Sequence, residues 1–418
     1  MDRTADAIFN TTGLFTPGRL GPYTLPHRML MAPMTRNRAR RDGVSSPSAV
    51  IYYAQRTSAA MIVTETTTVS EQAVGYPLMP GIHTADHVAG WRPVVDAVHR
   101  FGCRFFLQLF HAGRVSHPSL QPGEALPVAP SPIAPIGQSP TYEGPTAFLP
   151  PRALALEEIP NIVEQFRVAA HNALLAGFDG VEIHGANGYL LDQFLRDGSN
   201  QRTDAYGGSV ANRIRLLLQV TEAVADVWGA DRVGVRISPL NAFNTMFDSN
   251  PGQTFGTLVT ELAGFHLAYL HVVEEDGAPE SGPRFDVGGL RDLWNGPYIV
   301  NGNYDYTRAI KVIADGRADF VSFGKLFLAN PDLPLRFARR APLNLLDRGS
   351  FYGGDDRGYI DYPFLEDPSP RCSGSFWRPA AARSILHSVA IVHGFKVKCA
   401  TGDGTAMANA KSFRPKRT

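Results

Sequence analysis

Short apolar runs with strand character recur along the chain, and most of them precede a segment whose apolar positions follow helical spacing. Eight such runs occur, at residues 29–32, 60–64, 104–109, 180–184, 232–237, 268–273, 298–301 and 319–323. Six helices are expected between them, over residues 47–58, 87–101, 159–176, 209–228, 255–265 and 306–315. Eight strand units with intervening helices predict an α/β fold, a closed parallel (β/α)8 TIM barrel.

The connection after the third strand is long and rich in proline, running from residue 111 to residue 159. A loop of this length inside a compact domain is usually a lid or an excursion hairpin, and a domain linker is the alternative. We therefore expect this segment to overhang the site.

The charge distribution sets the C-terminal part apart from the rest of the chain. Residues 371–418 contain nine Lys or Arg and a single acidic residue, Asp403, although the whole chain has a net charge of only +1. We predict a single barrel domain over residues 13–367 and a basic extension over residues 368–418. Such a composition is typical of a flexible or loosely docked segment, and a specific binding arm is the alternative.

Composition excludes several classes of partner and site. A net charge of +1 gives no general attraction to nucleic acid or membranes, so small molecules are the expected partners. Cys103, Cys372 and Cys399 are widely separated and indicate neither a zinc site nor a disulfide framework. The chain shows no signal-peptide run and no apolar stretch of membrane-spanning length, so a cytoplasmic protein is expected, as a monomer or homodimer.

Polar residues fall at the carboxyl ends of the predicted strands, where barrel enzymes assemble their sites. They are Thr35, Arg36, Glu65, Thr66, Gln108, His184, Arg236, Asn301, Gly302, Asn303, Gly324 and Lys325. We expect them to converge on one mouth of the barrel. Taken singly, His184 also fits a structural histidine and Arg236 a buried ion pair. No His-x-His or His-Glu-x-x-His spacing accompanies His184, so no metal site is expected.

Two glycine-containing strand ends predict a phosphate site. Gly302 and Asn303 follow the seventh strand, and Gly324 and Lys325 follow the eighth. Barrels often bind a phosphate between these two loops, because glycine lets backbone N–H groups approach the oxygens. The chain has no Gly-x-Gly-x-x-Gly motif after a strand and no Walker loop, so a phosphate-bearing cofactor in the barrel is favoured over a separate nucleotide domain.

The segment His184-Gly185-Ala186-Asn187-Gly188-Tyr189 comes directly after the fourth strand. It places an imidazole, an amide and a phenol within six residues. Two hydrogen-bond donors and a phenol are suited to polarising a carbonyl group and delivering a proton.

Several separated motifs together resemble the Old Yellow Enzyme family, the FMN-dependent ene-reductases on a TIM barrel, and especially its 12-oxophytodienoate reductase-like members. The resemblance covers roughly residues 13 to 367. Its motifs are Leu14-Phe15-Thr16-Pro17, Met31-Ala32-Pro33-Met34-Thr35-Arg36, Gly75-Tyr76-Pro77, Gln108-Leu109-Phe110-His111-Ala112-Gly113-Arg114, His184 to Tyr189, Asn200 to Gly208, Phe323-Gly324-Lys325 and Asp361-Tyr362-Pro363.

The resemblance implies an FMN-dependent NAD(P)H oxidoreductase that reduces the C=C bond of α,β-unsaturated carbonyl compounds or similarly activated alkenes. It implies that FMN is held around its ring by Pro33, Thr35, Thr66, Gln108 and Arg236, and at its phosphate by Gly302, Asn303, Gly324 and Lys325. NADPH or NADH and the alkene would use the same face of the flavin in turn.

Roles in the reaction are also implied by the resemblance. His184 and Asn187 would bind the carbonyl oxygen of the substrate, flavin N5 would give the hydride, and Tyr189 would give the proton. Tyr76, Phe110 and Tyr352 would line the substrate pocket.

Three residues depart from the family pattern. Lys325 stands where arginine is usual, Thr66 where alanine is frequent, and Phe110 where close relatives often have tryptophan. These departures leave phosphate affinity and substrate range open. A redox-neutral double-bond isomerase, a specialised biosynthetic reductase on the same site, and a flavin-binding interaction module are the alternative functions.

Overall fold

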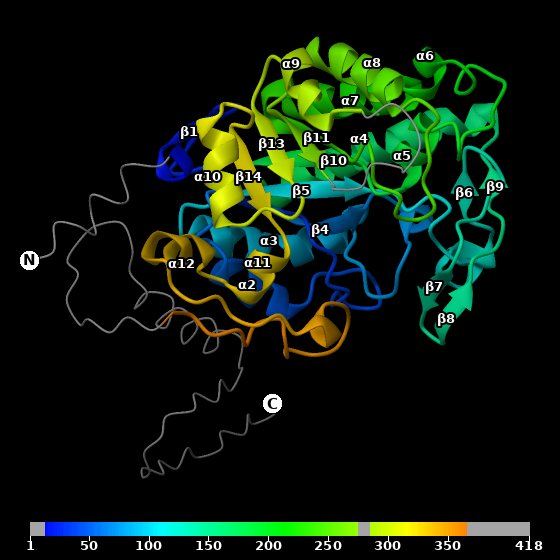
Figure 1. The fold of residues 1–418 in the computed structure, drawn as a ribbon. Coiled ribbons are helices and arrows are strands. Elements are labelled where there is room, and N and C mark those ends of the chain that lie inside the picture. The colour runs from blue at the N-terminus through cyan, green and yellow to red at the C-terminus, as the bar shows by residue number, and fades with distance from the viewer. Residues whose placement is uncertain (1–12, 275–284, 366–418) are drawn as a thin grey trace, which may run out of the picture. The chain divides into compact units, whose positions relative to one another are not determined.

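A closed barrel of eight parallel strands forms the centre of the molecule (Figure 1). The computed structural model describes residues 13–274 and 285–365. The barrel strands, in order around the closed sheet, are β3 (Met29–Met31), β4 (Met61–Thr68), β5 (Arg104–Phe110), β10 (Gly180–Gly185), β11 (Val233–Ile237), β12 (Tyr269–Val273), β13 (Tyr298–Asn301) and β14 (Phe320–Phe323). All eight predicted strands and the TIM-barrel class are confirmed.

Helices cover the outside of the barrel and connect successive strands (Figure 1). The larger ones are α2 (Pro47–Gln55), α3 (Ala85–His99), α4 (Ile159–Ala176), α7 (Arg215–Trp228), α8 (Pro251–Ala263) and α10 (Tyr306–Ala314). Shorter helices are α5 (Leu190–Leu195), α6 (Val210–Arg213), α9 (Leu290–Leu293), α11 (Lys325–Ala329) and α12 (Leu333–Arg339). The helix predicted over residues 209–228 is interrupted at Ile214, and Ser209 caps its first part by accepting from the Asn212 N–H.

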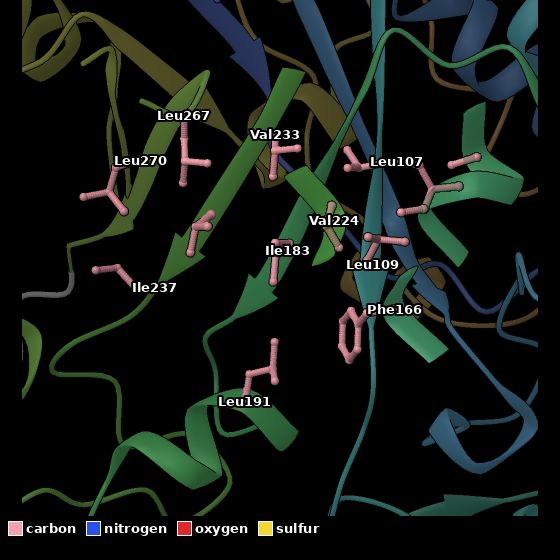
Figure 2. Packing of buried hydrophobic residues seen from close by; sticks show 14 of the residues in the cluster. Leu107, Leu109, Phe166, Ile183, Leu191, Val224, Val233, Ile237, Leu267 and Leu270 are labelled. Atoms are coloured by element: carbon pink, nitrogen blue, oxygen red, sulfur yellow. The ribbon is translucent and has the colours of Figure 1, made fainter. Parts of the chain in front are cut away.

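Alternation along the strands divides the barrel into an outer and an inner face. Leu107, Leu109, Ile183 and Ile237 belong to an apolar cluster that also contains Phe166 of α4 and Val224 of α7, two helices outside the barrel (Figure 2). Neighbouring positions of the same strands therefore point into the barrel, because successive side chains of a strand lie on opposite faces. The polar residues of the predicted site occupy these inward positions.

An N-terminal hairpin closes the bottom of the barrel, a feature that the sequence analysis did not predict. Its strands are β1 (Gly18–Leu20) and β2 (Tyr23–Leu25), which pair antiparallel. Leu20 and Leu25 pack with Leu30 and other buried residues of the strands' amino-terminal ends. This apolar layer leaves the opposite, carboxyl end as the face on which a site can form.

The long connection after β5 contains short strands of its own: β6 (Val128–Ala129), β7 (Gln138–Thr141), β8 (Gly144–Ala147) and β9 (Arg152–Ala153). Strands β7 and β8 form an antiparallel hairpin, and β6 pairs with β9. Phe148, just after β8, packs against a cluster that includes Met79 and Tyr189. The expected excursion hairpin therefore exists and reaches the residues of the predicted substrate pocket.

The predicted basic extension, residues 368–418, lies outside the described residues together with Cys372 and Cys399. Across residues 13–274 and 285–365, none of the helices combines the length and the apolar character needed to cross a membrane.

Candidate active site

Strand register brings the inward-pointing polar residues together at the carboxyl end of the barrel. His184 of β10 pairs with Arg236 of β11, and Arg236 pairs with His271 of β12. Gln108 of β5 lies beside Glu182 of β10, because those two positions are also register partners. Thr66 of β4 pairs with Gln108 on its other side.

Glu182 and His271 form the centre of a buried hydrogen-bond network that the sequence analysis missed. Gln108 Nε2 donates to Glu182 Oε1 over 2.7 Å, and His271 Nδ1 lies 2.8 Å from Glu182 Oε2. On its other side, His271 Nε2 lies 2.8 Å from Ser322 Oγ of β14. Four strands of the barrel are thus connected by one chain of side-chain bonds. The sequence signal was present, because both residues are polar at inward positions of otherwise apolar strands.

The network holds a charged carboxylate next to a neutral imidazole. Burial alone would raise the pKa of Glu182, but His271, Gln108 and the charge of Arg236 hold that pKa below its usual value. Burial lowers the pKa of His271. At neutral pH, therefore, Nδ1–H of His271 donates to the carboxylate and Nε2 accepts from the Ser322 hydroxyl.

Gln108 is oriented by this network. Since its Nε2 donates to a carboxylate, which only accepts, the amide oxygen is directed away from Glu182. That oxygen, Oε1, is buried and has no hydrogen-bond partner within the described part of the chain. A buried acceptor without a partner is costly, so this position is suited to a ligand that offers an N–H group.

His184 is a buried, neutral imidazole. It is 2 % exposed, and burial, together with the nearby Arg236 and His271, lowers its pKa well below the usual value. Its Nδ1 is buried, and no residue in the two described ranges forms a hydrogen bond with it. A structural histidine normally has both ring nitrogens satisfied, so the geometry favours a ligand-binding role.

Arg236 of β11 is held in place by Asn301 of β13. Its Nη2 donates to Asn301 Oδ1 over 2.9 Å, and Asn301 Nδ2 donates to the Ser322 carbonyl over 2.9 Å. Only 6 % of Arg236 is exposed. The guanidinium is therefore a fixed positive charge at the mouth of the barrel.

The remaining predicted ring-binding residues lie on the neighbouring strand ends. The hydroxyl oxygens of Thr35 and Thr66 are 2.8 Å apart, so they share one hydrogen bond. Pro33 and Thr35 are partly buried in the segment that follows β3. The structure thus places Thr66 beside Gln108 and Thr35 beside Thr66.

The predicted phosphate residues lie after β13 and β14. Gly302 has φ +118°, and a Cβ there would lie 1.8 Å from the Glu274 carbonyl oxygen. Glycine is thus required at this strand end, where two backbone segments approach closely. Asn303 and Lys325 are exposed and Gly324 is partly buried, so a lysine ammonium is available at the surface end of the site.

Tyr189 lies close to the imidazole and to a second phenol. The ring centroids of His184 and Tyr189 are 5.2 Å apart, and the hydroxyl oxygens of Tyr76 and Tyr189 are 3.0 Å apart. Burial raises the pKa of Tyr189 to about 12, although hydrogen bonds with Tyr76 and Asn244 act in the opposite direction. The phenol is therefore protonated at neutral pH.

Asn187 is positioned by backbone conformation and by the loop after β11. Its φ is +58°, in the left-handed region that asparagine tolerates better than most residues. Its N–H donates to Ser238 Oγ over 2.7 Å, and its Oδ1 accepts from Asn241 Nδ2 over 3.0 Å. Asn241 and Asn244 were not found from sequence, because nothing in the loop's pattern indicates which residues fold back onto Asn187.

The predicted pocket residues differ in their accessibility. Phe110 is fully buried and packs edge-on against Tyr189 at 4.5 Å between centroids, so it supports the phenol from behind. Tyr352 is 68 % exposed, yet it is close enough for its charge to raise the pKa of Tyr76 and of Tyr189. Met79 and Phe148, which the sequence analysis did not name, belong to the same apolar cluster.

The residues present fit FMN. The unpartnered Oε1 of Gln108 is an acceptor suited to the ring imide N–H, and the Arg236 guanidinium suits the part of the ring that gains negative charge on reduction. Lys325 offers a cation for the phosphate. Acceptor, cation and phosphate loops thus lie at one end of the barrel.

Comparison with known proteins agrees with this chemistry. Residues 13–344 match the NADH:flavin oxidoreductase / NADH oxidase family. The chain is 47 % identical to 12-oxophytodienoate reductase 1 of Oryza sativa subsp. japonica over 364 residues, which cover 85 % of this chain and 93 % of that protein.

Solved structures give the same result. Morphinone reductase superposes with a TM-score of 0.81 at 45 % identity, covering 87 % of this chain and 99 % of the other. An Old Yellow Enzyme homologue from Zymomonas mobilis superposes with a TM-score of 0.81 at 41 % identity, covering 84 % and 100 %. The chain therefore belongs to the NADH:flavin oxidoreductase / NADH oxidase family, the Old Yellow Enzyme family, and is an FMN-dependent oxidoreductase with a nicotinamide reductant.

Proposed function

We propose that this protein reduces the carbon–carbon double bond of α,β-unsaturated carbonyl compounds and similarly activated alkenes, with NADPH or NADH as the reductant. The observation that carries the proposal is the closeness of the His184 and Tyr189 rings, with Asn187 on the short segment between them, at the end of the barrel that carries the residues suited to FMN. The names of the relatives, 12-oxophytodienoate reductase and morphinone reductase, both denote ketone substrates, which supports a carbonyl-bearing alkene.

The imidazole and the amide bind the substrate oxygen in this proposal. A neutral His184 offers one N–H, and Asn187 offers its Nδ2. Two donors on the carbonyl oxygen stabilise the negative charge that develops there, and the β-carbon becomes electron-poor as a result. When bound, FMN supplies the hydride for that carbon, which it has received from the reduced nicotinamide.

Tyr189 donates the proton to the α-carbon in this proposal. With a pKa of about 12 the phenol is fully protonated at neutral pH and needs no separate activation to act as an acid. Tyr76 and Asn244 lie within hydrogen-bonding reach of its oxygen. They stabilise the phenolate that forms once the proton has left.

Further residues hold the cofactor and exclude water. Pro33, Thr35, Thr66, Gln108 and Arg236 surround the ring, and Gly302, Asn303, Gly324 and Lys325 hold the phosphate. The fully buried Phe110, together with Met79 and Phe148, forms the apolar wall behind Tyr189. Because an apolar wall excludes water and lowers the local dielectric constant, it strengthens the hydrogen bonds to the substrate oxygen. Tyr76 and Tyr352 line the substrate pocket in this proposal.

The test is Tyr189→Phe, which removes the hydroxyl and keeps the ring. Alkene reduction should slow by about 100-fold or more, the range typical for loss of a general acid, while FMN reduction by NADPH stays within about twofold. Stopped-flow absorbance of the two half-reactions gives both rates. If Tyr189→Phe slowed only the reduction of FMN, the assigned role would be wrong.

A further inference from the structure

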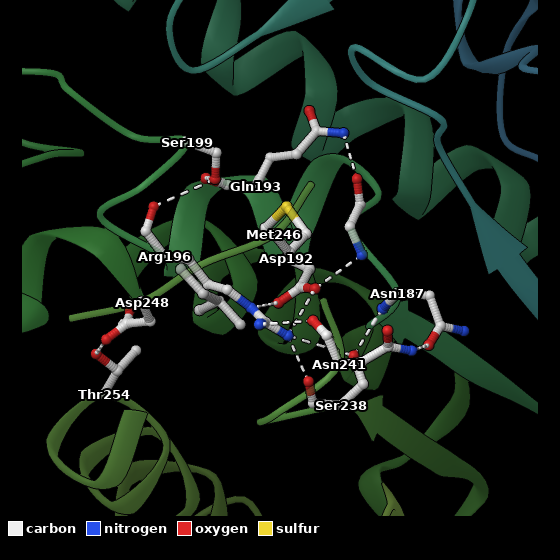
Figure 3. Close-up of polar contacts among 12 residues, drawn as sticks. Asn187, Asp192, Gln193, Arg196, Ser199, Ser238, Asn241, Met246, Asp248 and Thr254 are labelled. Atoms are coloured by element: carbon white, nitrogen blue, oxygen red, sulfur yellow. Dashed lines mark hydrogen bonds and ion pairs between the residues drawn. The ribbon is translucent and has the colours of Figure 1, made fainter. Parts of the chain in front are cut away.

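The loop that follows β11 binds the turn that carries Asn187. Besides the Ser238 bond, Asn244 Nδ2 donates to the Asn187 carbonyl over 2.8 Å. Asn241 Nδ2 donates to Asn187 Oδ1 (Figure 3). The backbone of Asn187 and its side chain are thus fixed separately. The side-chain bond decides which end of the amide faces the site.

A backbone N–H sets the direction of this bond. The Phe243 N–H donates to Asn241 Oδ1 over 2.6 Å, and a backbone N–H can only donate. Asn241 therefore donates to Asn187 through its NH2 group. The atom of Asn187 that accepts this bond must be the amide oxygen, Oδ1. Within residues 13–274 and 285–365, no acceptor pairs with the Nδ2 of Asn187, so this donor is left for a ligand or for water.

A buried ion pair anchors both sides of this arrangement. Arg196 Nη1 donates to the Asn241 carbonyl over 2.9 Å, and Arg196 pairs with Asp192 at 2.9 Å (Figure 3). Asp192 in turn accepts the Gly188 N–H over 2.8 Å. Arg196 and Asp192 are 2 % and 0 % exposed. The positions of Asn241 and of the turn at 187–188 are consequently fixed relative to each other.

We propose that Asn241 is a positioning residue that makes Asn187 a hydrogen-bond donor to the substrate. The proposal rests on the function given above and deepens it. Asn241 does not touch the substrate. Because the Phe243 N–H fixes which end of the Asn241 amide donates, it also fixes which end of the Asn187 amide faces the substrate.

The test is Asn241→Asp, which keeps size and shape but removes the donor. The carboxylate still accepts from the Phe243 N–H, but it now also needs a donor from Asn187, so the Asn187 amide turns and presents its oxygen to the substrate. Reoxidation of the dithionite-reduced holoenzyme by 2-cyclohexenone should slow by about 100-fold, the loss typical for one oxyanion donor. Asn241→Ala, which leaves the amide free to turn, should show a loss of about 10-fold.

A matched control and a double mutant separate positioning from general damage. Asn250→Asp makes the same chemical change in the same loop, where Asn250 caps α8 and aspartate caps equally well, so it should stay within twofold of wild type. In an Asn187→Ala background, Asn241→Asp should change the rate by less than about twofold, because its target is gone. A full additional loss in that background would overturn the proposal, and so would a wild-type rate in Asn241→Asp.

Binding of a saturated ketone tests the role of Asn241 independently of the proposed function. Titration of the oxidised holoenzyme with cyclohexanone needs no turnover, and Asn241→Asp should weaken its binding roughly 10-fold or more. If wild type binds cyclohexanone, Asn241→Asp weakens that binding and no alkene is reduced, the function is wrong while the role of Asn241 stands. Equal cyclohexanone affinity in wild type and Asn241→Asp contradicts the role of Asn241.

Discussion

Two polar networks meet at the mouth of the barrel, and they are held in different ways. The first network connects Gln108, Glu182 and His271 on neighbouring strands, and both Glu182 and His271 are at most 1 % exposed. The second connects Asn187 with Asn241 and the rest of the loop after β11, and Asn187 itself is only partly buried. One network is part of the barrel core, whereas the other lies on connecting segments.

We expect the strand network to contribute mainly to the stability of the fold and the loop network mainly to substrate binding. Removing a partner from the strand network leaves buried polar groups unsatisfied inside the fold, so stability should fall most there. Truncating Asn187, a partly buried member of the loop network, removes a side chain that water can reach, so stability should change less while substrate binding suffers. Variants in the two networks should therefore differ in what they lose.

The largest effect is expected for Glu182→Ala. Loss of the carboxylate leaves Gln108 Nε2 and His271 Nδ1 without their partner and leaves the Arg236 charge uncompensated, so the free energy of unfolding should drop by about 3 to 5 kcal/mol. Urea unfolding of the holoprotein measures this change. Glu222→Ala, on the exposed side of α7, is the control and should change it by less than about 0.5 kcal/mol. If Glu182→Ala lowered the free energy of unfolding no more than Glu222→Ala does, the strand network would not be the more stabilising of the two.

Asn187→Ala should have a large effect on the alkene half-reaction and a small effect on stability. The alkene half-reaction should slow by about 100-fold, equivalent to roughly 2.7 kcal/mol, because a donor to the substrate oxygen is lost. The free energy of unfolding should change by less than about 1 kcal/mol, because the side chain is partly exposed. Stopped-flow rates and urea unfolding on the same preparation give both numbers. Large losses in both would show that the loop network belongs to the core.

Gly302→Ala tests the strand end after β13, where the phosphate of FMN is proposed to bind. Its Cβ would collide with the Glu274 carbonyl oxygen, and alanine is strained at φ +118°, so the segment after β13 must move at a cost of about 1 to 3 kcal/mol. The dissociation constant of FMN, measured by fluorescence titration, should rise roughly 10-fold. Gly316→Ala also has a positive φ but meets no atom within 4 Å, and it should leave FMN binding within twofold. Equal effects of the two changes would argue against a cofactor role for Gly302.

The smallest effect concerns pH. The raised pKa of Tyr189, about 12, keeps the phenol protonated until the solution is strongly alkaline, and the lowered pKa of His184 keeps the imidazole neutral until the pH falls well below 6.5. Between pH 6 and 9 neither group changes charge, so neither should produce a break in the pH profile of reoxidation by 2-cyclohexenone. A break in the profile near pH 7 that disappears in Tyr189→Phe would show that the phenol is far more acidic than its burial implies.

The sequence allowed the strand-held part of the site to be predicted and left most of the loop-held part open. Apolar runs located all eight strands, and parallel strands bring their carboxyl ends together, so Gln108, His184 and Arg236 were expected at one mouth. Glu182 was overlooked although its inward position follows from that of His184 two residues later. Asn241 could not be found, since its role depends on a loop conformation that no periodic pattern specifies.

The measurement that tests the central claim most directly is the visible spectrum of the purified protein during one anaerobic cycle. The account predicts a yellow protein with bound FMN whose absorbance is bleached by NADPH or NADH and restored by stoichiometric 2-cyclohexenone, with cyclohexanone as the product. A colourless folded protein that does not bind added FMN, or a bleached protein that no activated alkene reoxidises, would contradict it.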